Sequence, residues 1–207
     1  MALVKYNNNS ISAVTAAASI PSGALTHIKT LTASSSATLS FVDGSSDVVL
    51  DSTYPIYLFK FYDIHPSASN SYFQFNMSTD GGSNYNVAKT TTWFQAYHFE
   101  NDGGAGLGYN ASRDLAQGTG YQDISTTMTT DNDLSLSGQM ELFNPSSTTF
   151  VKHFIIRANH MTDNPASNDS YCAGYGNTAS AVNAISFRMN SGNLDAGKIK
   201  LYGIKDS

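Results

Sequence analysis

The chain contains little charge. Charged residues make up 13% of its 207 residues, about half of the roughly 25% usual in soluble domains. Ser, Thr and Asn supply the polarity instead, and a surface of this kind packs closely against neighbours because little self-repulsion opposes the contact. The net charge is −5 with scattered positive residues. No basic stripe is available to follow a phosphate backbone, so nucleic acid is not an expected partner.

Cysteine and long apolar runs are also scarce. Cys172 is the single cysteine, which excludes an internal disulfide and indicates synthesis in a reducing compartment. Residues 1–10 hold one Lys and no apolar block follows them, so no cleaved export signal is expected. The longest apolar runs fall far short of the ~20 residues of a membrane helix. The sequence therefore predicts a soluble product made in a cytoplasm, without a membrane partner.

Residues that favour helices are few. Only two Glu occur, Glu100 and Glu141, among 16 acidic residues. The remaining acids are Asp, whose short side chain caps turns. Twelve Tyr and eleven Phe favour strands. The hydrophobic content of 41% provides enough material for a sizeable core. These features together predict an all-β protein.

Alternating patterns locate the strands. The strongest is Tyr54–Ile64, which is apolar on both faces and is expected in the middle of a sheet. Asp43-Gly44 is a hairpin signal, and Thr90–Phe99 is a strand for which a helix is the competing interpretation. Residues 101–108 and most of 112–133 have the composition of loops. The other expected strands are Ala24–Thr32, Ala37–Val42, Asp47–Leu50, Ser71–Met77, Leu134–Phe143, Phe150–Ala158 and Ser170–Gly176.

The C-terminal residues predict a closing hairpin. Ala184–Met189 and Lys198–Lys205 both alternate, and the stretch between them is rich in turn residues. With about eight to ten short strands and no repeat, the chain is expected to form one sandwich or barrel. Residues 25–207 form this domain, and residues 1–24 are expected to be an N-terminal arm, partly extended, with a short helix at Val14–Ser19 as the alternative.

No metal centre is expected from the histidines. No two of them have the i, i+4 spacing of a zinc protease and none neighbours a cysteine. If one strand runs through residues 153 and 160, their side chains point to opposite faces. Asp131–Asp133 and Asp163–Pro165 are rich in oxygen ligands, but turn capping explains them better than calcium does. The five histidines are His27, His65, His98, His153 and His160.

No catalytic or cofactor-binding motif stands out either. The sequence around Cys172 matches no nucleophile motif, and nothing brings Glu100 and Glu141 together as a glycosidase pair. Residues 103–108 are rich in glycine but lack the Lys-Ser/Thr ending of a phosphate-binding loop. We therefore expect no catalytic, cofactor-binding or metal-binding residues, and a protein that is not an enzyme.

Aromatic residues are the remaining candidates for a site. Flat rings with a polar edge could form a sugar-stacking platform. They could equally belong to the core or to subunit contacts, where Tyr and Trp are enriched, and this second interpretation is favoured. The rings concerned are Tyr72, Trp93, Tyr97, Tyr109, Tyr171 and Tyr175.

Three blocks of sequence carry a resemblance to a known group. They are Ser191–Ile204, which reads SGNLDAGKIKLYGI, the opening Leu3–Asn8 followed by Ser10–Ser12, and Thr38–Gly44. These blocks resemble structural proteins of tailed bacteriophages, especially marine phages that infect cyanobacteria and related ocean bacteria. The resemblance implies a jelly-roll-like antiparallel β-sandwich on the virion surface, synthesised in the host bacterial cytoplasm. It supplies no catalytic residues.

The expected function is therefore that of a capsid decoration or cement protein on the outer capsid surface. Its partners would be the major capsid protein or other virion proteins and further copies of itself, with a symmetric trimer favoured. The N-terminal arm and the aromatic faces are the candidate contacts. The alternative is a tail-fibre or capsid-appendage module that binds host surface glycans. A polysaccharide-degrading enzyme is the third hypothesis, for which the chain lacks both length and repeats.

Overall fold

The computed structural model describes residues 24–206, and this part of the chain contains twelve strands and no helix. The all-β prediction is confirmed, and the arm predicted at residues 1–24 lies almost wholly outside the described residues. The strands are β1 (Leu25–Thr32), β2 (Leu39–Val42), β3 (Ile56–Pro66), β4 (Phe73–Ser78), β5 (Lys89–Phe99), β6 (Ala105–Tyr109), β7 (Gln122–Asp123), β8 (Leu136–Phe143), β9 (Lys152–Met161), β10 (Ala166–Gly176), β11 (Ala184–Met189) and β12 (Leu194–Ile204).

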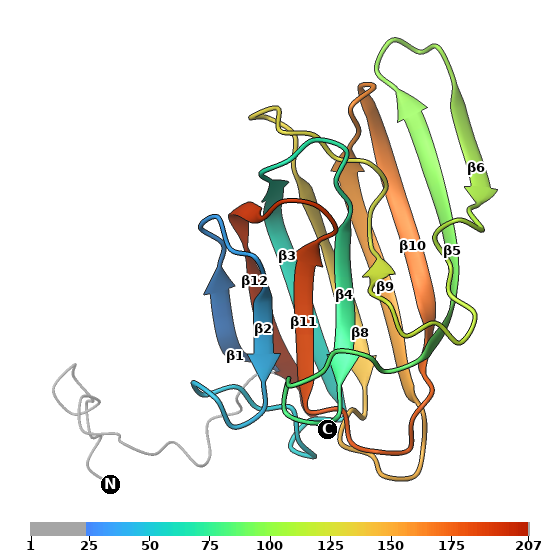
Figure 1. Cartoon of the computed structure of the whole chain (residues 1–207). Coiled ribbons are helices and arrows are strands. Elements are labelled where there is room, and N and C mark those ends of the chain that lie inside the picture. The colour runs from blue at the N-terminus through green and yellow to red at the C-terminus, as the bar shows by residue number, and fades with distance from the viewer. Residues whose placement is uncertain (1–23, 207) are drawn as a thin grey trace, which may run out of the picture.

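Two antiparallel sheets pack face to face as a sandwich (Figure 1). One sheet has eight strands in the order β1-β12-β3-β8-β9-β10-β5-β6, and the other has four in the order β2-β11-β4-β7. Among the described strands, the consecutive pairs β5–β6, β8–β9 and β9–β10 are each hydrogen-bonded within one sheet, and every other connection crosses from one sheet to the other. The jelly-roll assignment stays a prediction, since eight strands against four differs from the eight-stranded jelly roll.

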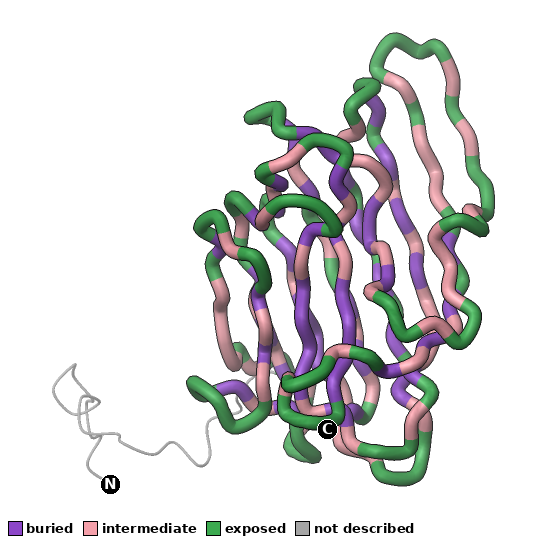
Figure 2. The backbone as a smooth tube through the Cα atoms, viewed as in Figure 1, coloured by how far each residue is buried: buried purple, intermediate pink, exposed green. Residues whose placement is uncertain are grey.

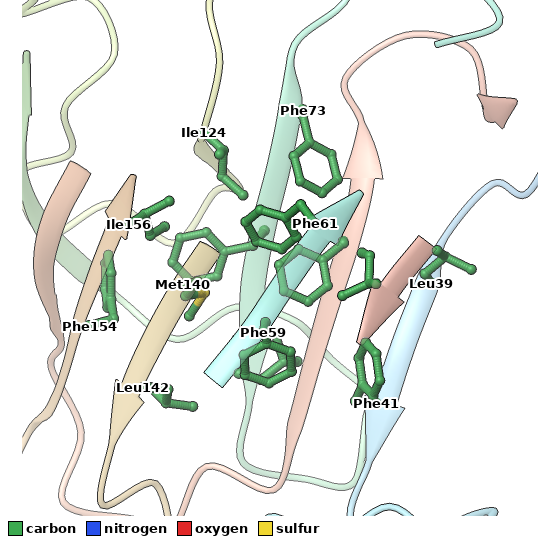
Figure 3. Packing of buried hydrophobic residues seen from close by; sticks show 14 of the residues in the cluster. Leu39, Phe41, Phe59, Phe61, Phe73, Ile124, Met140, Leu142, Phe154 and Ile156 are labelled. Atoms are coloured by element: carbon green, nitrogen blue, oxygen red, sulfur yellow. The ribbon is translucent and has the colours of Figure 1, made fainter. Parts of the chain in front are cut away.

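Aromatic side chains from both sheets fill the core (Figure 3). Phe187 of β11 has its ring within 5.4 Å of Phe59 and 5.3 Å of Phe61 across the sandwich. On its own sheet it is 5.8 Å from Phe73 and 6.3 Å from Phe41. Edge-to-face and offset contacts at these separations are the favoured geometries of aromatic pairs. This ring cluster fixes how the two sheets sit against each other.

Side chains alternate between the buried and the exposed face along the strands, as the sequence pattern predicts. Along β9 buried and exposed residues alternate from Lys152 to His160, with Phe154 and Ile156 facing the core. Strand β3 lies between β12 and β8, which confirms its predicted central position. Figure 2 shows burial concentrated along the middle strands, where both sheets overlap. One face of the eight-stranded sheet is thus covered and the other faces solvent.

The predicted closing hairpin is wrong. Strand β11 lies between β2 and β4 in the four-stranded sheet, whereas β12 lies between β1 and β3 in the eight-stranded sheet. The short connection 190–193 crosses from one sheet to the other. A left-handed backbone at Gly192, with φ of 71°, helps it turn. Alternation in the sequence shows which side of a strand is buried but does not identify the sheet it joins.

Two further local predictions need correction. Residues 47–50 form no strand: the Gly44 N–H bonds the Val48 carbonyl at 2.9 Å, and Asp43 Oδ1 accepts the Leu50 N–H at 2.8 Å, closing a loop. Residues 105–108 of the predicted loop belong to the edge strand β6. The strand predicted at residues 90–99 is confirmed against its helix alternative, because this segment pairs with β10 along its whole length as β5.

Candidate binding face on the eight-stranded sheet

The four-stranded sheet covers one face of the eight-stranded sheet and leaves the opposite, outer face open among the described residues. Strand register brings side chains from distant parts of the chain into rows across it. One row runs through Glu141, Ile155, Ala173 and Thr92 on neighbouring strands. Ile155 in this row is 53% exposed although it lies mid-strand. Single exposed apolar side chains are common on protein surfaces, so Ile155 alone does not mark this row as a contact site.

Apolar exposure is strongest at the β5–β6 end. Leu107 is 75% and Tyr109 57% exposed, and Phe94, which lies opposite Tyr109 in the register, is 39% exposed. No residue of β6 and none from Gln95 to Phe99 is buried. In Figure 1 the upper part of this hairpin extends beyond the four-stranded sheet, and Figure 2 shows it in the intermediate and exposed colours. The hairpin is thus a single layer with uncovered apolar side chains.

A bonded cluster continues the face from Phe94 inwards. The ring of Tyr171 stacks on Phe94 with centroids 4.7 Å apart and planes within 3° of parallel. The guanidinium of Arg157 lies 5.1 Å from the Tyr171 centroid, and its Nη2 donates to Asp169 Oδ2 at 2.7 Å. The Tyr171 hydroxyl donates to the same carboxylate at 2.9 Å. These contacts hold four outward-pointing side chains in fixed positions.

The ionisation of Asp169 follows from this cluster. Partial burial works against the charged carboxylate, but hydrogen bonds from Arg157 and Tyr171 outweigh it, so the pKa of Asp169 is lower than its usual value. The hydrogen bond that Arg157 donates to Asp169 is also the main cause that raises the pKa of Arg157. Arg157 and Asp169 are therefore both charged at neutral pH and compensate each other.

A groove of about 660 Å³ lies next to this cluster on β3, β8, β9 and β10. Its pairing ladder is interrupted at one end, where the β3–β8 register shifts between Phe61 and Ile64 and Asp63 takes a left-handed backbone with φ of 49°. Bulges of this kind disrupt the ladder locally, and this one includes Tyr62. The polar side chains lining the groove include Lys60, Tyr62, Gln139, Arg157, Asn159 and Asp169.

The six rings considered as a sugar-stacking platform do not come together. Trp93 is fully buried and its indole N–H donates to the Asp123 carbonyl at 3.1 Å. Tyr72 packs against the guanidinium of Arg113 at 4.0 Å, away from the outer face. Only Tyr109, Tyr171 and Tyr175 belong to outward rows of the eight-stranded sheet. The hypothesis that these six rings form a single sugar-stacking surface is therefore wrong.

Sequence reasoning missed Phe94, Tyr62 and the pair Arg157–Asp169 as members of one face. The alternation in residues 90–99 already placed Phe94 opposite Trp93, which could have marked it as outward. The pairing of Arg157 with Asp169 had no such signal, because it depends on which strands become neighbours.

The histidines and acidic residues form no site in the described chain. His153 is exposed and His160 is buried, which confirms that they face opposite sides of β9. Burial, aided by the charge of Arg113, lowers the pKa of His160 to about 4, and its Nε2 lies 2.7 Å from Thr126 Oγ1. Within residues 24–206 no group of three His, Cys, Asp or Glu could hold a metal ion.

Three side chains of reactive types, Cys172, Lys152 and Lys89, are buried in the sandwich. Burial raises the pKa of the Cys172 thiol, which disfavours the nucleophilic thiolate. Lys152 donates to the carbonyls of Phe150 at 2.6 Å and Thr178 at 3.1 Å. Lys89 donates to Asn76 Oδ1 at 2.6 Å. None of the three lies in the lining of the outer-face groove.

Comparison with known proteins adds no relative: no family model, no curated protein and no solved structure matches the chain. Among residues 24–206 there is also no helix of the length and hydrophobicity required to cross a bilayer.

Proposed function

We propose that the protein is a structural component of a tailed-phage virion, most simply a decoration or cement protein that binds the outer capsid surface. The observation that carries this proposal is the uncovered β5–β6 hairpin, with Leu107 and Tyr109 exposed at the edge of the sheet. The resemblance of residues 191–204 to virion structural proteins supplies the setting. The role is mechanical: buried contact area between neighbours strengthens the particle.

The hairpin suits such a contact in two ways. Among the described strands β6 ends the sheet order and pairs with β5 alone, so its other edge can accept a strand from a partner. Its exposed apolar side chains add area that does not depend on ion pairs. At the ~0.5 M ionic strength of seawater the Debye length is only a few ångströms, so apolar and hydrogen-bonded contacts are the ones that persist. A stable interface would bury on the order of 1,200–2,000 Å².

The test uses purified virions of the phage that encodes the chain. Quantitative mass spectrometry is expected to find a copy number comparable to that of the major capsid protein, as decoration requires. The double variant Leu107→Ser/Tyr109→Ser is expected to be lost from particles. Phe150→Ser is the matched control, because Phe150 is 72% exposed but lies in the β8–β9 connection. Equal incorporation of both variants, or absence of the protein from virions, contradicts the proposal.

A second candidate function is recognition of host surface glycans by a fibre or capsid appendage. The fixed outward cluster of Phe94, Tyr171, Arg157 and Asp169 favours it, because sugars bind surfaces that combine ring faces with planar polar groups. Copy number separates the two functions, since an appendage is present in few copies per particle.

A further inference from the structure

The groove on the outer face contains polar groups that the described protein leaves without partners. Within residues 24–206, neither the ammonium of Lys60 nor the carboxamide of Gln139 takes part in a hydrogen bond or ion pair. Asn159 uses its Nδ2 donors on Ser167 Oγ at 3.0 Å and the Asn168 carbonyl at 3.2 Å, which leaves Oδ1 as an acceptor. Donors and acceptors from three neighbouring strands thus face one open volume.

Arg157 adds donors in a fixed orientation. Its Nε and Nη2 atoms bind the Asp169 carboxylate at 3.2 and 2.7 Å, while a guanidinium has five N–H groups in a rigid plane. The Nη1 donors have no partner among the described residues. Because the plane is already held by Asp169 and Tyr171, a ligand binding these donors would not have to order the side chain.

The lining of the groove carries an excess positive charge at Lys60. Arg157 and Asp169 compensate each other, so Lys60 is the single uncompensated charge in the lining. Lys200 lies next to Lys60 in the β12–β3 register and its Nζ sits 5.0 Å above the Tyr62 ring at the rim. Besides Asp169, the same face holds Glu141 of β8, two residues from the Gln139 that lies opposite Lys60 in the register. An excess of positive charge here stands out on a chain of net charge −5.

These features match one class of ligand. Neighbouring hydroxyl groups of a sugar ring each donate and accept, so they pair well with planar side chains such as Gln139, Asn159 and Arg157. The C–H face of a sugar packs on an aromatic ring, and Tyr62 at the rim is 36% exposed, with Lys200 over one face of its ring. An anionic group on the sugar would compensate Lys60 through a charge-assisted hydrogen bond.

We propose that this groove binds an acidic saccharide, with the sugar carboxylate at Lys60 and its hydroxyl groups on Gln139, Asn159 and Arg157. This site goes beyond the structural role proposed above, since it lies on β3, β8 and β9 rather than at β6, and it specifies the ligand for the glycan alternative. The ligand class follows from the groove lining alone and does not depend on the capsid contact.

The test is isothermal titration of the full chain with a uronic-acid oligosaccharide and with its carboxyl-reduced neutral counterpart. We expect the acidic sugar to bind. The neutral sugar is expected to bind at least about tenfold more weakly, because it lacks one charge-assisted hydrogen bond. Lys60→Gln is expected to reduce affinity for the acidic sugar by about tenfold. Lys29→Gln is the matched control, because Lys29 on β1 lies outside the groove and undergoes the same change of charge.

Several outcomes would overturn this assignment. They are absence of binding to the acidic sugar, equal binding of the two sugars, or equal effects of Lys60→Gln and Lys29→Gln. Circular dichroism serves as the folding control, and both variants are expected to fold because neither lysine is buried. Failure here is separable from failure of the virion proposal, since Lys60→Gln is expected to leave incorporation into particles unchanged.

Discussion

Lys89 and Asn76 are bound to each other in the interior of the sandwich, joining the two sheets. Lys89 Nζ of β5 donates to Asn76 Oδ1 of β4 at 2.6 Å and to the Val87 carbonyl at 2.9 Å. The two residues are 0% and 1% exposed, and no carboxylate pairs with the ammonium among the described residues. A buried lysine without a counter-ion is costly when charged, so this contact makes stability depend on pH.

The pH dependence has a defined direction. Burial lowers the pKa of Lys89 to about 7 from its usual 10.5. Between these values the unfolded chain binds more protons than the folded one, so the free energy of unfolding rises as pH increases through this window. With about 1.4 kcal/mol per pKa unit, we expect a gain on the order of 2–3 kcal/mol between about pH 7 and about pH 9.5. Urea unfolding at a series of pH values measures it.

Lys89→Met isolates this contribution. Methionine cannot titrate, and Asn76 Oδ1 still accepts the Met77 N–H at 2.9 Å, whereas the Val87 carbonyl loses Lys89 as its donor. We expect the variant to lose the rise in stability with pH and to be at least as stable as the parent near pH 7. The same slope in both proteins would show that Lys89 is not responsible.

A second prediction concerns the ion pair beneath Tyr72. Arg113 Nη1 donates to Asp123 Oδ2 at 2.7 Å, with side chains only 12% and 15% exposed. Burial raises the pKa of Asp123, and the hydrogen bonds from Gln74 and Arg113 oppose that rise. Arg113→Met would leave a buried carboxylate without its cation, and we expect a loss of about 3 kcal/mol in the free energy of unfolding.

Two comparison variants test the cause. Asp123→Asn added to Arg113→Met is expected to recover much of the loss, because it removes the unpaired charge. Arg157→Met breaks the pair with Asp169 on the outer face, where the Arg157 side chain is 63% exposed, and little change in stability is expected there. Equal losses at the two sites would contradict a role for burial.

The sequence shows which side chains share one face of a strand, but it does not show which strands become neighbours in a sheet. Alternation in residues 150–158 groups Lys152 with Phe154 and Ile156, and the structure buries all three on the same side of β9. The same pattern could not place β11 and β12 in different sheets. The groove depends on β3 lying beside β8, and β4 to β7 lie between these two strands in the chain, whereas β8 and β9 follow each other directly. A period of two carries no information about such long-range pairing.

The ring cluster at the centre of the sandwich gives the last prediction. Phe187 contacts Phe59 and Phe61 of the opposite sheet at 5.4 and 5.3 Å, and it is completely buried. Phe187→Ala removes these contacts and leaves a cavity between two sheets that cannot easily collapse, so we expect a loss of about 3–5 kcal/mol in the free energy of unfolding. Phe150→Ala, at a ring 72% exposed, is expected to change stability by less than about 0.5 kcal/mol. Denaturant unfolding of both variants measures the difference, and a comparable effect at the two positions would mean that the cluster does not hold the sheets together.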